Sequence, residues 1–242
     1  MRHQPLRAKS PRKLPLLWQG ANSGQKAGRP RPRIGSRIRE KRFFLGYLIA
    51  AVLLLHPSAA QALLVDNFEQ HGALNMLGNP AHGFAQGPST LLAVRRWIPP
   101  EGGREAGGEV LMLHYAKQVR GGPGNAGGWC GYYTLLKMPG QGGTPDRYFD
   151  GTPYRAITFW IRGQRGDENF IVGLVDRYWD RAGGSDLAKG IGAYLPAGKV
   201  TREWQRASIP LDEFVVDFDQ MSSIVFMFEG TGTVYIDQIV LE

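Results

Sequence analysis

Apolar residues in this chain gather in short runs, each bounded by glycine, proline or other turn-forming residues. The runs are about five to nine residues long, which is typical of β-strands and too short for most globular helices. Val, Ile, Thr, Phe, Tyr and Trp dominate them, and these residues suit a pleated, half-buried surface. The pattern predicts strands at 63–68, 110–115, 129–136, 155–161, 170–176, 204–209, 224–228 and 233–241, with a further strand at 91–97.

Side chains alternate within several of these runs. In 155–161, Ile157, Phe159 and Ile161 share one face of the strand and Thr158 and Trp160 share the other. No long amphipathic helix is visible, and one helical turn is expected at 210–214. Short strands joined by long glycine-rich connections predict an all-β fold with two packed antiparallel sheets, a β-sandwich.

The chain before residue 63 reads differently. Basic residues at 37–42 precede an unbroken apolar run at 43–55 and an Ala-Gln-Ala sequence that ends at Ala62, which together predict a signal peptide over 37–62. A membrane-spanning helix needs about 20 apolar residues, so the shorter run favours cleavage after Ala62. The alternative is an uncleaved signal anchor, the one route by which the chain would contact a membrane. In either case the rest of the chain is exported, to the periplasm or the extracellular space.

The basic charge of the chain belongs to this leader. The first 62 residues carry thirteen Lys and Arg against one Glu, whereas the remainder carries sixteen Lys and Arg against twenty Asp and Glu. Residues 1–36 lack any periodic apolar pattern and are expected to form a disordered basic extension. Because the folding part is mildly acidic, nucleic-acid binding is excluded as a main function.

Residues 63–242 are long enough for one domain with a single well-buried core. Cys130 is the one cysteine of the sequence, so no intrachain disulfide can form. A lone cysteine inside an aromatic run is expected to be a buried, inert thiol.

Four segments in order carry a family resemblance. They are 64–69 (LVDNFE), 154–163 (YRAITFWIRG), 201–214 (TREWQRASIPLDEF) and 232–239 (GTVYIDQI). Together they resemble the galactose-binding-like jelly roll and, most closely, the family 11 carbohydrate-binding modules. The resemblance spans 64–241 and implies a two-sheet jelly-roll sandwich that binds a polysaccharide or oligosaccharide.

The resemblance also implies roles for individual residues. The two terminal segments would be neighbouring strands, Trp204 would be structural and Phe214 would return to the core. Many such modules hold a structural calcium ion where the chain ends meet, and calcium requires several oxygen ligands. The acids there are Asp66, Glu69 and Asp237, of which Glu69 and Asp237 match better. The alternative is that these acids only accept hydrogen bonds in surface loops.

Two groups of residues are candidates for a sugar site, because sugars are bound by aromatic rings on their faces and by polar side chains at their edges. The first is the segment 176–181 (DRYWDR), with Asp176, Arg177, Tyr178 and Trp179 as ligand-binding candidates; the alternative is a solvated loop with self-paired charges. The second is Trp129 and Tyr133, which alternation places on one face of a strand, with Tyr132 on the other. One of these two faces must be core, and the sequence leaves open which.

Catalytic patterns are missing from the sequence: there is no HExxH, no GxSxG and no phosphate-binding GK[ST]. We therefore expect a non-catalytic carbohydrate-binding protein outside the cytoplasm. Two alternatives remain. One is a structural or assembly protein that uses the same fold to contact a protein partner, and the other is a small polysaccharide hydrolase or lyase.

Overall fold

The computed structural model describes residues 61–70, 72–100, 107–118 and 128–242. The chain divides into two compact units, Met1–His56 and Pro57–Glu242, and every described residue belongs to the second. The predicted basic extension and the predicted signal segment up to residue 60 lie outside the described residues. Within the described ranges, no helix combines the length and apolar character that crossing a membrane requires.

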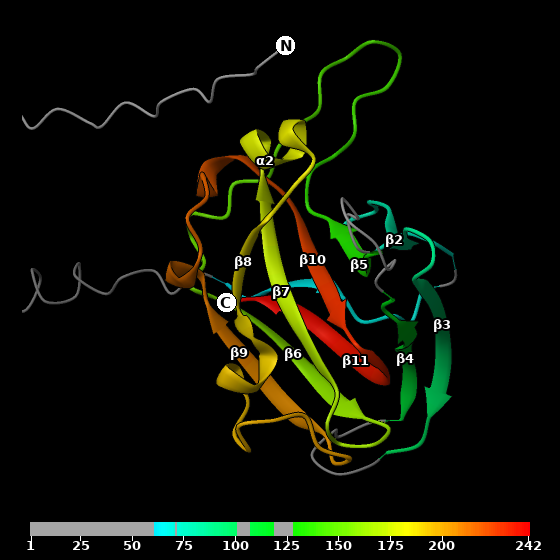
Figure 1. Cartoon of the computed structure of the whole chain (residues 1–242). Coiled ribbons are helices and arrows are strands. Elements are labelled where there is room, and N and C mark those ends of the chain that lie inside the picture. Colours follow the sequence, from blue (N-terminus) through cyan, green and yellow to red (C-terminus); the bar gives the residue numbers. More distant parts are fainter. Residues whose placement is uncertain (1–60, 71, 101–106, 119–127) are drawn as a thin grey trace, which may run out of the picture. The chain divides into compact units, whose positions relative to one another are not determined.

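The described chain is built almost entirely of strands (Figure 1). They are β1 (Leu63–Asp66), β2 (Ala81–Ala85), β3 (Thr90–Ile98), β4 (Gly108–Ala116), β5 (Cys130–Leu135), β6 (Ala156–Gly163), β7 (Asn169–Asp176), β8 (Asp186–Gly190), β9 (Gln205–Pro210), β10 (Met221–Glu229) and β11 (Thr231–Leu241). The helical elements are the short helix α2 (Arg177–Ala182) and the 3-10 turns η1 (Ile191–Tyr194), η2 (Leu211–Glu213) and η3 (Phe218–Gln220).

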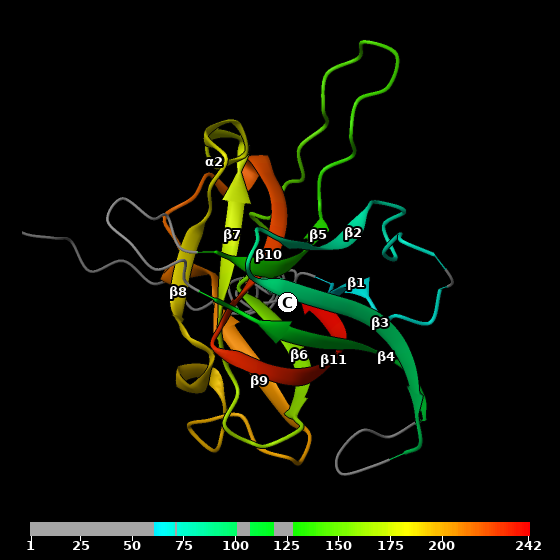
Figure 2. The same cartoon turned by 45° about the vertical axis from the view of Figure 1, so that its right-hand side comes forward.

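The strands form two antiparallel sheets. One has the order β3-β4-β11-β6-β9, with β1 also paired to β11, and the other has the order β2-β5-β10-β7-β8. Figure 2 shows β3 and β4 side by side in the first sheet. Buried side chains from both sheets make one core, which confirms the predicted sandwich. Each predicted strand and the predicted helical turn exist, whereas β2, β8 and α2 were not predicted.

The two ends of the domain lie together, as the resemblance implied. Leu63 pairs with Leu241 and Leu64 with Val240, so β1 and β11 are antiparallel neighbours. Phe214 is buried in the core, and Trp204 is buried in a smaller cluster with Ile98 and Val110. Half-buried Trp160 and Tyr235 pack on that cluster, which places it on the outer side of the six-stranded sheet.

Aromatic rings fill the centre of the core. Phe226 of β10 is fully buried, with its ring centre 5.4 Å from that of Phe159 in β6 and 5.9 Å from that of Phe170 in β7. Ile157 and Ile161 are buried beside Phe159, as the alternation predicted. Cys130 is also buried as expected, and its burial raises the pKa of the thiol above the usual value.

Candidate functional site

The outer face of the five-stranded sheet carries an unusual set of side chains. Strand alternation sends Tyr132 and Phe226 into the core and turns their neighbours Tyr133 and Val225 to the outside. The structure thereby decides the question that the sequence left open. Tyr132 belongs to the core, and Tyr133 and Trp129 lie on the outer side.

The register of the strands places these outward residues in rows across the sheet. One row runs through His82, Tyr133, Val225, Gly173 and Leu187. The next row runs through Phe84, Gly131, Met227 and Ile171. Both rows are largely apolar, although they lie on a face that is turned away from the core.

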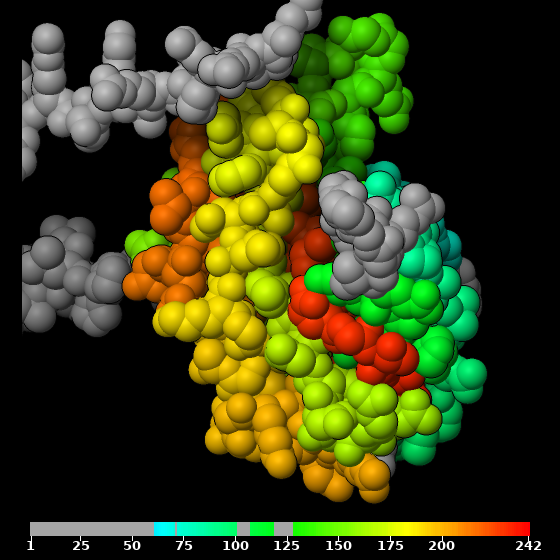
Figure 3. All heavy atoms as spheres, viewed as in Figure 1, coloured from blue at the N-terminus to red at the C-terminus, as the bar shows by residue number. Residues whose placement is uncertain are grey.

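Residues in the middle of this face are less exposed to solvent than residues at its two sides. Val225 is only 7% exposed and Ser223 and Val175 are similarly covered, whereas Leu187 is 47% exposed and Trp129 is 42% exposed. Figure 3 shows the visible part of β10 as a narrow strip set behind the yellow atoms of α2 and β8. We call this recess the furrow; its floor consists of Val175, Gly173, Ser223 and Val225.

One side of the furrow is an aromatic wall formed by His82, Phe84, Trp129 and Tyr133. The ring of Phe84 lies 5.4 Å from that of Trp129 in an edge arrangement and 6.2 Å from that of Tyr133 in a stacked one. His82 meets the edge of Tyr133 at 5.8 Å. Phe84 can lie flat on β5 because Gly131 has no side chain; a Cβ there would stand 2.5 Å from the ring.

The opposite side of the furrow is built in the same way from β8. Leu187 lies over Gly173, where a Cβ would stand 2.9 Å from the leucine Cδ2. Glycine within a strand commonly marks such a close approach. Gly131 and Gly173 thus let two large side chains from the edge strands lean over the sheet on either side of Val225.

Helix α2 follows the furrow floor directly, because β7 leads from Val175 into it. Asp176 begins the helix: one of its carboxylate oxygens accepts a hydrogen bond from the N–H of Trp179 at 2.8 Å, and the other accepts one from the N–H of Asp217 at 2.8 Å. Asp176 is buried, and these two hydrogen bonds hold the first turn of α2 and the chain at Asp217 in place. The segment predicted as a strand end or loop is a capped helical turn, since aspartate is a preferred N-cap residue.

A network of charges fixes segment 137–148 against α2. Lys137 Nζ donates to Asp146 at 2.6 Å and to Asp180 at 2.5 Å, and the hydroxyl of Tyr148 donates to Asp180 at 3.0 Å. Burial lowers the pKa of Lys137, but the hydrogen bonds to the two carboxylates outweigh this and raise it above its usual value.

Arg177 and Tyr178 face outward beside this network. The guanidinium of Arg177 lies 5.8 Å from the ring centre of Tyr148 and donates to Gln220 at 3.1 Å. The exposed ring of Tyr178 meets the edge of Trp179 at 5.3 Å. Arg177 and Arg181 line two cavities of about 550 Å3 each, one on the side of Tyr148 and one on the side of Gln220. Of the ligand-binding candidates in 176–181, Asp176, Arg177 and Tyr178 line the cavity on the side of Gln220, whereas Trp179 lines neither of these two cavities.

The predicted metal residues lie where the two terminal strands meet. Asp66 and Asp237 are both buried and close enough for their charges to interact. Glu69 does not join them, because its Oε1 accepts the N–H of Glu109 at 2.9 Å. Across the described ranges, no three Asp, Glu, His or Cys side chains gather closely enough to hold a metal ion.

The Asp66 carboxyl is nevertheless unusual. Its Oδ1 accepts the N–H of Phe68 at 2.9 Å, while its buried Oδ2 has no hydrogen-bond partner in the described part of the chain. Burial raises the pKa of Asp66 to about 6; the hydrogen bond from Phe68 and the charge of Arg95 oppose this rise, and the charge of Asp237 adds to it. A buried pair with an unpartnered oxygen fits a cation that also takes backbone oxygens.

Most of the furrow was not predicted from the sequence. His82, Phe84, Val225, Met227 and Leu187 come from three strands, two of which were missed. A signal for the site was nevertheless present: Gly131 and Gly173 each interrupt an otherwise apolar strand, which indicates close approach of another group.

The sequence is similar to a known family of carbohydrate-binding domains. A family model described as "Carbohydrate binding domain 30" matches residues 117–242, which include β5 to β11. No protein of curated function matches the sequence.

The solved structures that are similar to the chain include two family 11 carbohydrate-binding modules. One is the family 11 carbohydrate-binding module of the cellulosomal cellulase Lic26A-Cel5E of Clostridium thermocellum, with 16% identity, a TM-score of 0.50, and coverage of 76% of this chain and 95% of that one. The other is a family 11 module from Clostridium thermocellum in complex with a β-1,3-1,4-mixed-linked tetrasaccharide, with 16% identity, a TM-score of 0.50, and coverage of 76% and 96%. These similarities confirm the jelly-roll fold.

Proposed function

The chain belongs to the family of carbohydrate binding domain 30, and we propose that it binds its polysaccharide or oligosaccharide in the furrow of the five-stranded sheet. Carbohydrate binding without catalysis is the function that the family assigns to the domain.

The aromatic wall carries this proposal. A pyranose ring has apolar C–H faces that pack on aromatic rings and hydroxyl edges that need hydrogen-bonding partners. Trp129, Phe84 and Tyr133 offer continuous aromatic surface beside an apolar floor. Beyond the floor, Arg177 and Tyr178 offer polar groups where β7 enters α2. The arrangement suits a sugar chain that lies along the furrow with one end near α2.

Trp129→Ala is expected to weaken binding strongly, because it removes a large exposed ring of the aromatic wall. Aromatic residues at binding hot spots are worth about 2 kcal/mol or more, a loss of roughly 30-fold in affinity. The full chain would be screened on a glycan array, with a β-1,3-1,4-mixed-linked glucan tetrasaccharide as the first probe because the similar family 11 module binds it. Isothermal titration of the tightest ligand then compares the variants.

Trp97→Ala is the matched control. Trp97 is 67% exposed but lies in β3 of the other sheet, so its removal is expected to leave the affinity unchanged. Equal losses in the two variants, or no loss with Trp129→Ala, would refute the furrow as the binding surface.

We further propose that the domain works outside the cytoplasm, in the periplasm or the extracellular space. The predicted signal peptide supports this location, because its expected cleavage point at Ala62 immediately precedes the first residue of β1. A polysaccharide ligand is also consistent with such a compartment.

A structural calcium ion between Asp66 and Asp237 is also proposed. These carboxylates would hold the ion together with backbone oxygens, and its charge would offset their mutual repulsion and link β1 to β11. Ligand at 100 times its Kd stabilises a fold by about 2.7 kcal/mol, so EDTA is expected to lower the Tm of the full chain by roughly 5–10 °C.

Asp237→Asn is expected to remove the difference between the Tm measured in EDTA and the Tm measured in calcium. Asp167→Asn, which changes an exposed acid elsewhere, is expected to preserve it. The same Tm in EDTA and in calcium for the unmodified chain would exclude the ion.

A further inference from the structure

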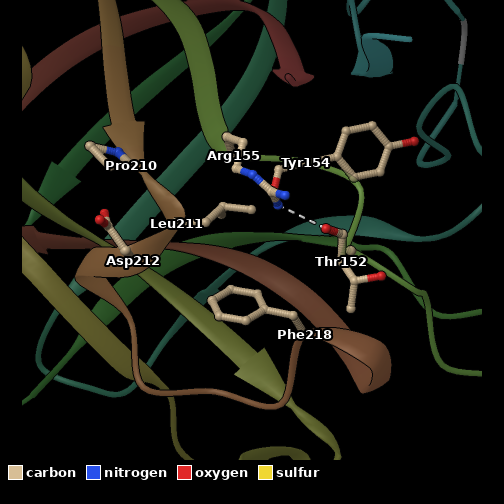
Figure 4. Close-up of a pocket in the computed structure, with 8 residues that line it drawn as sticks. Thr152, Tyr154, Arg155, Pro210, Leu211, Asp212 and Phe218 are labelled. Atoms are coloured by element: carbon tan, nitrogen blue, oxygen red, sulfur yellow. Dashed lines mark hydrogen bonds between the residues drawn. The ribbon is translucent and has the colours of Figure 1, made fainter. Parts of the chain in front are cut away.

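A separate pocket lies at the edge of the sandwich, where β6 begins and β9 ends (Figure 4). It has a volume of about 420 Å3. Two segments line it, and neither contributes to the furrow: Gly151, Thr152, Tyr154 and Arg155 come from the first, and Pro210, Leu211, Asp212 and Phe218 from the second.

Backbone hydrogen bonds hold the two segments together. The N–H of Gly151 donates to the carbonyl of Phe218 at 2.7 Å, and the N–H of Leu211 donates to the carbonyl of Arg155 at 2.8 Å. Asp150 fixes the turn by accepting both the N–H and the hydroxyl of Thr152, at 3.0 and 2.6 Å. Because these bonds exist without ligand, the pocket is formed in advance, which reduces the entropy lost on binding.

The pocket combines an apolar surface with polar edges. Leu211 is buried and Phe218 is half-buried, and Figure 4 shows the phenyl ring facing the space below Arg155 and Thr152. Arg155 Nη1 donates to the carbonyls of Thr152 and Tyr154 at 2.9 and 3.0 Å, which holds the guanidinium in place.

The remaining polar groups are available to a ligand. In the described part of the chain, Arg155 Nε and Nη2 donate to no other group, and the exposed carboxylate of Asp212 accepts no hydrogen bond. The pocket therefore offers donors on one side and an acceptor on another. The opposite charges of Arg155 and Asp212 balance, so the pocket favours a neutral ligand over an anion.

From this chemistry we propose that the pocket is a second carbohydrate site that binds a single terminal sugar unit. One apolar face, several hydroxyl groups and no net charge describe a pyranose ring. The volume is near the lower end of the 300–1,000 Å3 that is typical of small-molecule sites, which limits the ligand to a small unit. The proposal rests on the carbohydrate-binding family of the chain and not on the furrow.

Chemical-shift mapping of the full chain tests the proposal. The probes are D-glucose, D-galactose, D-xylose and methyl β-D-glucoside, each titrated into the millimolar range. At least one probe is expected to shift the amide signals of 151–155 and 211–218. Asp212→Asn keeps the shape of the pocket but removes the charged acceptor, and it is expected to weaken this binding about tenfold.

Three comparisons complete the test. Phe218→Leu retains an apolar side chain but removes the ring, and it is also expected to weaken binding. Asp167→Asn, a charge change outside the pocket, and Val225→Phe, which fills the furrow, are expected to leave these shifts unchanged. The proposal is overturned if no probe shifts the two segments, or if the shifts persist at equal affinity in both Asp212→Asn and Phe218→Leu. A finding that the furrow binds no carbohydrate would change neither the expected result for this pocket nor the result that overturns the proposal.

Discussion

Val225→Phe is expected to abolish carbohydrate binding while leaving the domain folded. Val225 lies on the furrow floor between Tyr133 and Gly173, so a phenyl ring there would occupy the space that a sugar needs. The side chain points away from the core, so the larger ring is expected to project into the furrow and not into the packed interior. We expect the affinity to fall by about 100-fold or more, comparable to the loss of a central hot spot.

Val215→Phe provides the matched control for this change. Val215 is 85% exposed and lies outside the furrow, so the same substitution there should not affect binding. Isothermal titration measures both variants, and near-ultraviolet circular dichroism checks that each is folded. An unchanged affinity in a folded Val225→Phe protein would place the ligand elsewhere.

Phe226→Ala is expected to have the largest effect on stability. Phe226 follows Val225 in β10 but points to the opposite side, where it is fully buried between Phe159 and Phe170. Truncation of a buried phenylalanine to alanine costs about 3–5 kcal/mol, since it removes apolar contacts and leaves a cavity. The Tm of the full chain should fall by roughly 10 °C or more.

The comparison for stability is Phe84→Ala. It makes the same change on the outer face, where the ring is only partly buried, and should cost clearly less stability while weakening binding. Denaturant unfolding of both variants gives the two free energies. Equal losses would contradict the assignment of Phe226 to the core and Phe84 to the furrow wall.

The strands that the sequence predicted carry apolar runs or, as in β9, alternating apolar positions, because burial on at least one face demands such a pattern. The strands that it missed are short and mixed: β2 reads Ala-His-Gly-Phe-Ala and β8 reads Asp-Leu-Ala-Lys-Gly. Both lie at the edges of their sheet. Edge strands bury less surface, so their sequences carry weaker periodicity, and their pairing became visible only in the register of the folded sheet.

The candidate site was likewise predictable from the sequence only in part. Alternation alone put Trp129 and Tyr133 on one face, but only the packing of the second sheet assigns Tyr132 to the core. Leu187 faces this wall across strands that are distant in sequence, which no local pattern records. In the sequence, the charge of Asp176 beside two aromatic residues indicates ligand binding, whereas in the structure its place before the short helix α2 gives it a capping role.

We infer that the outer face of the five-stranded sheet binds carbohydrate, and chemical-shift mapping with the tightest ligand from the glycan array is the direct test of this inference. We expect the largest shifts at Tyr133, Gly173, Val225 and Met227, with smaller ones at Arg177. Shifts concentrated instead at Trp160 and Tyr235, on the outer side of the six-stranded sheet, would contradict it.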